Sequence, residues 1–140
     1  MEMSAFFPFY RNHNVFAAIS QEAYVWSSVA ESSRRAMSIR YSLLPYMYTL
    51  FYNAHTQAET VMRALAWEFP NDVSLADVET QFMLGPDLLI TPVLEPLATT
   101  VRGVFPGVSD GTIWYDWYTL QPVNAAAGQN LTLDAPLEKM

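Results

Sequence analysis

The sequence predicts a fold in two parts, an α/β part followed by an all-β part. An almost wholly apolar run, Ser4 to Tyr10, has the character of a buried strand. Apolar residues from Val29 to Ala54 then recur at the three-and-four spacing of a helix face. After Ala58 come short strand-like runs separated by Pro, Gly, Asp and Asn, which is typical of an antiparallel sheet or a small sandwich.

The first predicted strand ends in polar side chains. Arg11, Asn12, His13 and Asn14 follow Tyr10 directly. In a β/α scaffold, polar groups at the carboxyl end of a strand face the ligand-binding side. The neutral imidazole of His13 can donate or accept a hydrogen bond with a ligand hydroxyl, although a lone histidine is commonly a structural residue. A strand of this parallel type also needs neighbouring strands that the chain does not contain.

The helical pattern predicts one long, buried helix. Ser27 or Ser28 offers an N-cap, and Glu31 completes a capping box. Pro45 removes a helix hydrogen bond, so we expect it to kink or divide the helix just before it. Arg40, Pro45 and an apolar length below the ~20 residues of a membrane helix argue against a membrane span.

The predicted strands of the second part are short. Their ranges are Glu59 to Trp67, Leu88 to Val93, Thr100 to Phe105, Thr112 to Trp117 and Asn130 to Leu133. A short helix is predicted from Ser74 to Met83, with Ser74 as its cap. The periodicity changes near Arg63 to Leu65, so we expect a first domain over residues 1–64 and a second over residues 65–140.

Composition narrows the classes of function. The 140 residues are 51% hydrophobic and carry a formal net charge of -7, which indicates globular material that repels a phosphate backbone. We therefore expect no nucleic-acid partner. Cysteine is absent, and His13 and His55 have no matching carboxylate spacing, so we expect no metal site. The triplet Asn130-Leu131-Thr132 predicts a glycosylation site at Asn130 if the chain enters the secretory pathway.

Longer motifs resemble a known family, in the order that the family has them. They are Phe6 to Asn14 (FFPFYRNHN), Gln21 to Tyr24 (QEAY), Ile39 to Tyr46 (IRYSLLPY), Tyr48 to Phe51 (YTLF), Val61 to Arg63 (VMR), Glu68 to Asp72 (EFPND), Gln81 to Pro86 (QFMLGP), Leu88 to Val93 (LLITPV), Val104 to Gly107 (VFPG) and Trp114 to Asp116 (WYD). Together they resemble glycoside hydrolase family 31, the α-glucosidase group. The resemblance implies the terminal strand and long helix of a (β/α)8 TIM barrel, followed by a small antiparallel β-sandwich domain.

The same resemblance implies a retaining α-glucosidase, which hydrolyses terminal α-linked glucose from oligosaccharides through a covalent intermediate and without a cofactor. It gives His13 the role of binding the sugar on the non-reducing side of the scissile bond, and Arg11 that of supporting nearby carboxylates. The nucleophile and the acid/base of the family are aspartates that lie upstream of this chain. We therefore expect no catalytic residue here, an inactive chain that needs the rest of the barrel to fold, and a parent enzyme that is secreted or enters the secretory pathway.

A non-catalytic carbohydrate-binding or interaction module is the alternative. Trp114 to Tyr118 contains aromatic side chains of the kind that stack on sugars, although alternating aromatics also fill a sandwich core. A truncated gene product without a function of its own is a third interpretation. The carboxylates Glu68, Asp72, Asp77 and Glu79 are better explained as solvated or capping groups than as a catalytic pair.

Overall fold

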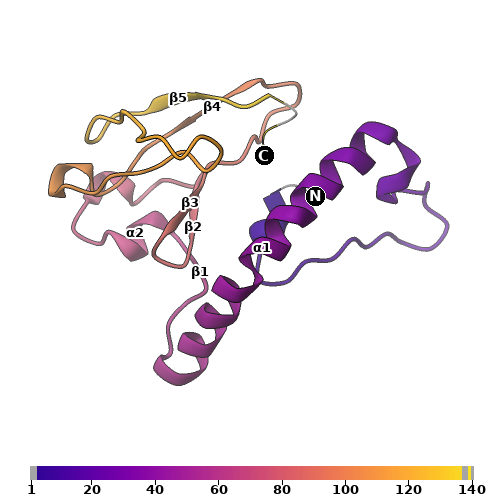
Figure 1. Cartoon of the computed structure of the whole chain (residues 1–140), viewed down its shortest axis with the longest axis horizontal. Coiled ribbons are helices and arrows are strands. Elements are labelled where there is room, and N and C mark those ends of the chain that lie inside the picture. The colour runs from indigo at the N-terminus through magenta and orange to yellow at the C-terminus, as the bar shows by residue number, and fades with distance from the viewer. Residues whose placement is uncertain (1–2, 137–138, 140) are drawn as a thin grey trace. The chain divides into compact units, whose positions relative to one another are not determined.

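The computed structural model describes residues 3–136 and 139. These residues divide into two compact units, one containing residues up to Met62 and the other spanning Arg63–Pro136. Figure 1 labels the helices and strands of both units, which are described separately below.

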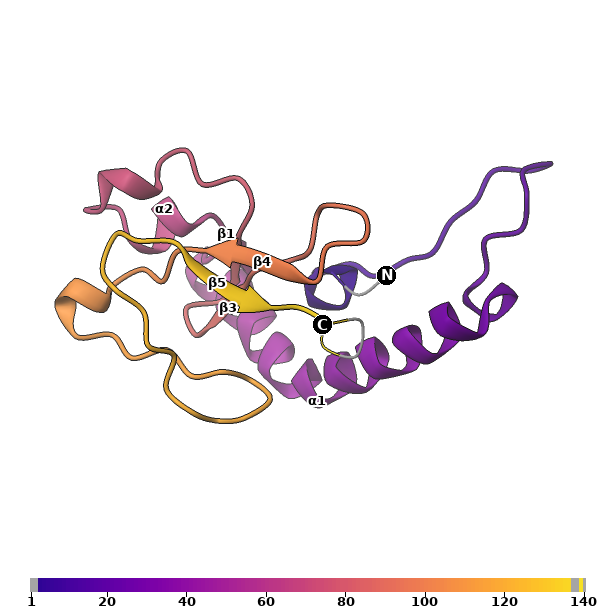
Figure 2. The same cartoon turned by 90° about the horizontal axis from the view of Figure 1, so that it is seen from above.

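The first unit is built around one long helix, α1, Ser27–Gln57. Two short 3-10 helices, η1, Met3–Phe6, and η2, Ala23–Val25, precede α1 and pack against it. In Figure 2, α1 is a single, gently curved helix that continues through Pro45. Of the two outcomes expected at Pro45, division of the helix is wrong, because the helix is anchored by buried side chains on both sides of the proline.

α1 has a buried face, and its exposed surface includes several aromatic side chains. The buried side chains recur at helical spacing and are Ser32, Ser33, Ala36, Leu43, Met47 and Leu50. The exposed aromatic side chains, which we call the aromatic stripe, are Tyr41, Tyr48, Phe51 and Tyr52. Tyr48, for example, is 78% exposed. Exposed aromatic side chains gathered on one helix are typical of a surface that packs against another part of a protein.

The strand predicted from Ser4 to Tyr10 is wrong for this structure. The segment begins with η1 and continues as bends and irregular backbone. Parallel strands are held by hydrogen bonds to neighbouring strands, and within residues 3–136 no strand pairs with this segment. Its carbonyl groups are bonded instead by a side chain of α1, Arg40.

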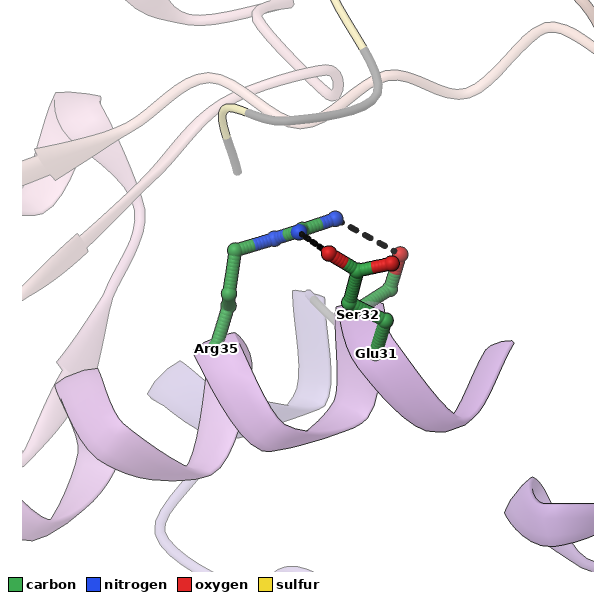
Figure 3. Close-up of polar contacts among 3 residues, drawn as sticks. All are labelled: Glu31, Ser32 and Arg35. Carbon is green, nitrogen blue, oxygen red and sulfur yellow. Dashed lines mark hydrogen bonds and ion pairs between the residues drawn. The ribbon is translucent and has the colours of Figure 1, made fainter. Parts of the chain in front are cut away.

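The predicted capping box at the start of α1 is also wrong. The N-cap is Trp26, which makes no side-chain capping bond, and Ser27 is already the first helical residue. Glu31 forms an ion pair with Arg35 on the next turn, with 3.0 Å between Oε1 and Nη1, as Figure 3 shows. Arg35 also donates from Nη2 to the hydroxyl of Ser32 at 3.4 Å. The carboxylate therefore stabilises the first turns through a pair at i and i+4 spacing.

The second unit contains two small sheets. Their strands are β1, Met62–Arg63, which begins at the last residue of the first unit, β2, Phe82–Leu84, β3, Leu88–Ile90, β4, Thr100–Gly103, and β5, Leu131–Asp134. The first sheet has the order β1-β2-β3, and the second pairs β4 with β5. Met83 lies opposite Leu89 in the antiparallel pair of β2 and β3, which is closed by a turn at Gly85. Gly85 has a φ of 60°, a conformation that favours glycine.

The antiparallel character of this unit is confirmed, and several bounds differ from the prediction. β3, β4 and β5 overlap the strands predicted from Leu88, Thr100 and Asn130. The strand predicted from Glu59 to Trp67 is reduced to β1, because the chain turns into a short helix, α2, Leu65–Glu68. An ion pair of 2.6 Å between Arg63 Nη1 and Glu68 Oε2 spans that turn.

Two further predictions in this unit are corrected. The helix predicted from Ser74 to Met83 is only a 3-10 turn, η3, Val73–Leu75, capped by Asp72, whose carboxylate accepts from the main-chain nitrogen of Ser74 at 3.0 Å. The rest of that range leads into β2. The strand predicted from Thr112 to Trp117 is an isolated bridge between Tyr115 and Pro122, preceded by a second 3-10 turn, η4, Val108–Asp110.

The core of the second unit lies where α2, η3 and β2 meet. Leu65, Leu75 and Met83 form its centre. Partly buried side chains surround them and are Ala66, Phe69, Val78, Leu89, Val104 and Trp114. Among the helices of the described residues, none combines the length and the apolar character that crossing a membrane requires.

Candidate functional site

Arg11 and His13 lie side by side at the end of the segment that follows η1. Nη2 of Arg11 is 2.9 Å from Nδ1 of His13, and both residues are exposed. A guanidinium can only donate hydrogen bonds, so Nδ1 of His13 must accept and the ring proton must sit on Nε2. The contact therefore leaves an N–H group on the far side of the imidazole that can donate to a ligand oxygen.

Two asparagines hold the loop around this pair. Nδ2 of Asn14 donates to the carbonyl of Ile19 at 2.8 Å, and the main-chain nitrogen of Val15 donates to Asn14 Oδ1 at 2.9 Å. Nδ2 of Asn12 reaches the carbonyl of Gln21 at 3.4 Å. The sequence places all four polar residues at one strand end as ligand-binding candidates. In the structure the two asparagines bind the loop itself, which leaves Arg11 and His13 as the candidates.

Arg40 holds the segment that leads to this pair, and the sequence analysis missed it. Its guanidinium donates to main-chain carbonyls of Ala5, Phe7 and Pro8 and lies over the ring of Tyr10. The available signal was a cation within an otherwise apolar and aromatic stretch of helix, because such a charge needs partners when it is partly buried.

The other sequence candidates have structural contacts. Nε1 of Trp114 donates to the carbonyl of Pro106 at 2.8 Å, and its ring packs edge-on against Phe105, with ring centroids 6.5 Å apart. Trp114 is therefore a packing residue of the second unit. Asp116 accepts from the main-chain nitrogens of Tyr118, at 3.0 Å, and Thr119, at 2.7 Å, which makes it a turn residue.

Two further candidates from the sequence, His55 and Asn130, are distant from Arg11 and His13 along the chain. His55 is exposed in the last turn of α1. Asn130 is exposed and immediately precedes β5, in which Thr132 is exposed as well. Within residues 3–136 and 139, no three His, Cys, Asp or Glu side chains come together as a potential metal site.

Family models match both parts of the chain. The model described as the glycosyl hydrolase family 31 C-terminal domain matches residues 58–140, and the model of the family 31 TIM-barrel domain matches residues 1–50. The chain therefore belongs to glycosyl hydrolase family 31. This match confirms the expected fold class, the end of a TIM barrel followed by a β domain.

Individual relatives agree with the family models. The chain is 63% identical over 137 residues to an α-glucosidase of Aspergillus niger, a match that covers 98% of this chain and 14% of that protein. It is 55% identical to glucoamylase 1 of Schwanniomyces occidentalis, again with 98% of this chain and 14% of that protein covered. A crystal structure of a glucosidase II alpha subunit superposes with a TM-score of 0.89 at 32% identity, covering 99% of this chain and 15% of that chain. The chain thus spans about one seventh of the length of these relatives.

Proposed function

We propose that this chain is the part of a retaining α-glucosidase that supplies a sugar-binding histidine, His13, to the active site. The observation that carries this proposal is the contact of Arg11 with Nδ1 of His13, which leaves the Nε2 proton free for a sugar hydroxyl. The high identity to an α-glucosidase of A. niger supports the choice of α-linked glucose as substrate. Solved family 31 relatives also include a dextranase in complex with glucose.

In this proposal the chain binds and orients the sugar, and other parts of the parent enzyme cut the bond. Retaining glycosidases use two carboxylates about 5–5.5 Å apart, one as nucleophile and one as acid and base. Glu68 and Asp72 are two described carboxylates close together in the sequence, but both have structural roles. Glu68 pairs with Arg63, and Asp72 caps η3. A donor at Nε2 of His13 that tightens as the sugar ring distorts would lower the barrier to bond cleavage.

The test uses a chimeric enzyme, in which the matching 137 residues of the A. niger α-glucosidase are replaced by those of this chain. Loss of one hydrogen bond in a dry pocket costs about 1–3 kcal/mol, which corresponds to roughly 5- to 150-fold in rate. We expect His13→Ala to lower kcat/KM for maltose by that factor. His55→Ala is the matched control and should leave kcat/KM unchanged. Wild-type kinetics in His13→Ala would overturn the assignment.

Arg11 is tested in the same chimeric enzyme. We propose that Arg11 fixes the tautomer of His13, in addition to the expected support of nearby carboxylates. Arg11→Met removes the donor to Nδ1, so both neutral tautomers of the imidazole become populated. We expect a smaller loss of kcat/KM than in His13→Ala. In a His13→Ala background, Arg11→Met should cost less than it does alone, because only the support of the carboxylates is left to lose.

A carbohydrate-binding module remains the second candidate, because some aromatic side chains of the second unit are exposed. Tyr115, Trp117 and Tyr118 are 59%, 46% and 42% exposed. Exposed aromatic faces of this kind stack on sugar rings. Titration of the 140-residue chain with maltose, followed by tryptophan fluorescence, separates the two candidates. A saturable change that Trp117→Ala abolishes would favour the module, and its absence would favour the glucosidase proposal.

A further inference from the structure

One guanidinium, that of Arg40, holds the chain from η1 to Tyr10, just before the pair of Arg11 and His13. Nη1 of Arg40 donates to the carbonyl of Ala5 at 2.8 Å and to that of Phe7 at 2.7 Å. Nη2 donates to the carbonyl of Pro8 at 3.2 Å. The Cζ atom also lies 5.3 Å from the centroid of the Tyr10 ring, within the range of a cation–π interaction.

These contacts take the place of a strand ladder. The described residues contain no strand that pairs with residues 4–10, so the carbonyls of Ala5, Phe7 and Pro8 would otherwise rely on solvent. An arginine can serve three carbonyls at once because its several N–H groups project from a rigid plane, whereas the ammonium of a lysine is compact. Bonds to a charged donor are also stronger than bonds between neutral groups.

The held segment ends one residue before Arg11. Tyr10, whose ring lies under Arg40, is followed immediately by Arg11. Arg40 itself is 33 residues away in the chain from Phe7, whose carbonyl it binds. A displacement of a catalytic group by about 1 Å can cost about 100-fold in rate. The geometry of the imidazole therefore depends on the position of the segment that carries it.

We propose that Arg40 is a positioning residue for the sugar-binding pair of Arg11 and His13. It acts through the main chain of residues 5–10 and makes no contact with the substrate. The inference rests on the proposed role of His13, and it adds a residue of α1 to the machinery that aligns the sugar.

A double-mutant cycle in the chimeric enzyme tests the inference. We expect Arg40→Lys to lower kcat/KM for maltose by about tenfold and Arg40→Met to lower it further, since lysine retains the charge and part of the hydrogen bonding. In a His13→Ala background the same Arg40 substitutions should cost clearly less than they do with His13 present, because the imidazole that Arg40 helps to position is gone. Arg34→Lys, at an exposed position of the same helix, is the control.

The outcomes separate this inference from the proposed function. A loss in His13→Ala with none in Arg40→Met would overturn the inference alone, as would losses that multiply in the double variant. Normal kinetics in His13→Ala would overturn both.

Hydrogen exchange measured by mass spectrometry provides a readout that does not depend on turnover. In Arg40→Lys, amides of residues 6–14 should exchange faster, while amides of β2 and β3 keep their rates. Equal acceleration in all of these segments would show a general loss of stability and would contradict a positioning role.

Discussion

The side-chain amide of Gln81 pairs with both main-chain polar groups of Val104. Oε1 of Gln81 accepts from the Val104 nitrogen at 2.8 Å, and Nε2 donates to the Val104 carbonyl at 3.1 Å. Nε2 also donates to the hydroxyl of Thr91 at 2.9 Å. Gln81 is 5% exposed, and a Cβ atom at Gly103 would lie 2.5 Å from its Nε2. One buried side chain thus connects the start of β2 with the ends of β3 and β4.

Replacing this amide by a carboxylate is expected to loosen the second unit. In Gln81→Glu the donor is lost, and a charged oxygen faces the carbonyl of Val104. A buried polar group left without its partner costs about 1–3 kcal/mol. We expect hydrogen exchange of the β4 amides in the chimeric enzyme to report a loss of that size in the free energy of local opening. Gln121→Glu, at an exposed position, should leave these rates unchanged, and equal rates in both variants would contradict the structural role of Gln81.

The C-terminal end of α1 is expected to gain stability from a glycine. Ala58 follows the helix with φ 59° and ψ 28°, the left-handed conformation that costs an L-residue about 1–2 kcal/mol. Ala58→Gly should therefore slow hydrogen exchange in the last turn of α1 by a factor that corresponds to about 1 kcal/mol. Ala54→Gly, inside the same helix, should have the opposite sign and a similar size. A destabilising effect of Ala58→Gly would contradict the conformation of residue 58.

We propose that Asn130 accepts an N-linked glycan when the protein passes through a secretory pathway. Asn130 is exposed just before β5, and the hydroxyl-bearing Thr132 is exposed within it. Both the acceptor amide and the hydroxyl of the triplet are therefore accessible. Secretion of the chimeric enzyme from yeast, followed by enzymatic deglycosylation, should show one glycan fewer in Asn130→Gln and in Thr132→Val. Thr132→Ser should keep the glycan, and equal masses in all variants would exclude the site.

The 140-residue chain expressed alone is expected to self-associate and to release no glucose from maltose. The aromatic stripe of α1 is exposed, and apolar surface of this kind favours association. Fluorescence of a hydrophobic dye and light scattering measure the effect. Replacement of Tyr41, Tyr48 and Tyr52 by Ser should reduce dye binding. Glucose release by the purified chain, or a monomer that binds no dye, would contradict the expectation.

Periodicity predicted the parts of the fold that local sequence controls. The long helix follows from apolar side chains at helical spacing, of which Ala36, Leu43, Met47 and Leu50 are buried. β3, β4 and β5 follow from short runs between turn residues. β2 was missed because Phe82, Met83 and Leu84 are all buried, so they show no alternation of polar and apolar residues.

Long-range contacts decided the elements that the sequence analysis got wrong. Residues 4–10 have the composition of a strand, but their backbone is held by Arg40, whose partners are 32 to 35 positions away. The range from Glu59 to Trp67 has the composition of a strand too, but the pair of Arg63 and Glu68 spans the turn into α2. The polar motif of Arg11 and His13 was found from sequence. Its internal hydrogen bond was not, because residue type alone does not fix which of several acceptors an arginine side chain selects.

The anchoring of residues 5–10 from α1 has a consequence for engineering. The loop from Val15 to Ser20 lies between the polar motif and η2, and it is exposed. Phe16 is 98% exposed, and Ala17 has a φ of 67°. Doubling the length of a flexible loop costs only about 0.6 kcal/mol. An affinity tag or a reporter peptide inserted at Ala17 should therefore be carried without displacing the imidazole, because Arg40 holds the preceding segment from α1 and the bonds of Asn12 to Gln21 and of Asn14 to Ile19 close the base of the loop.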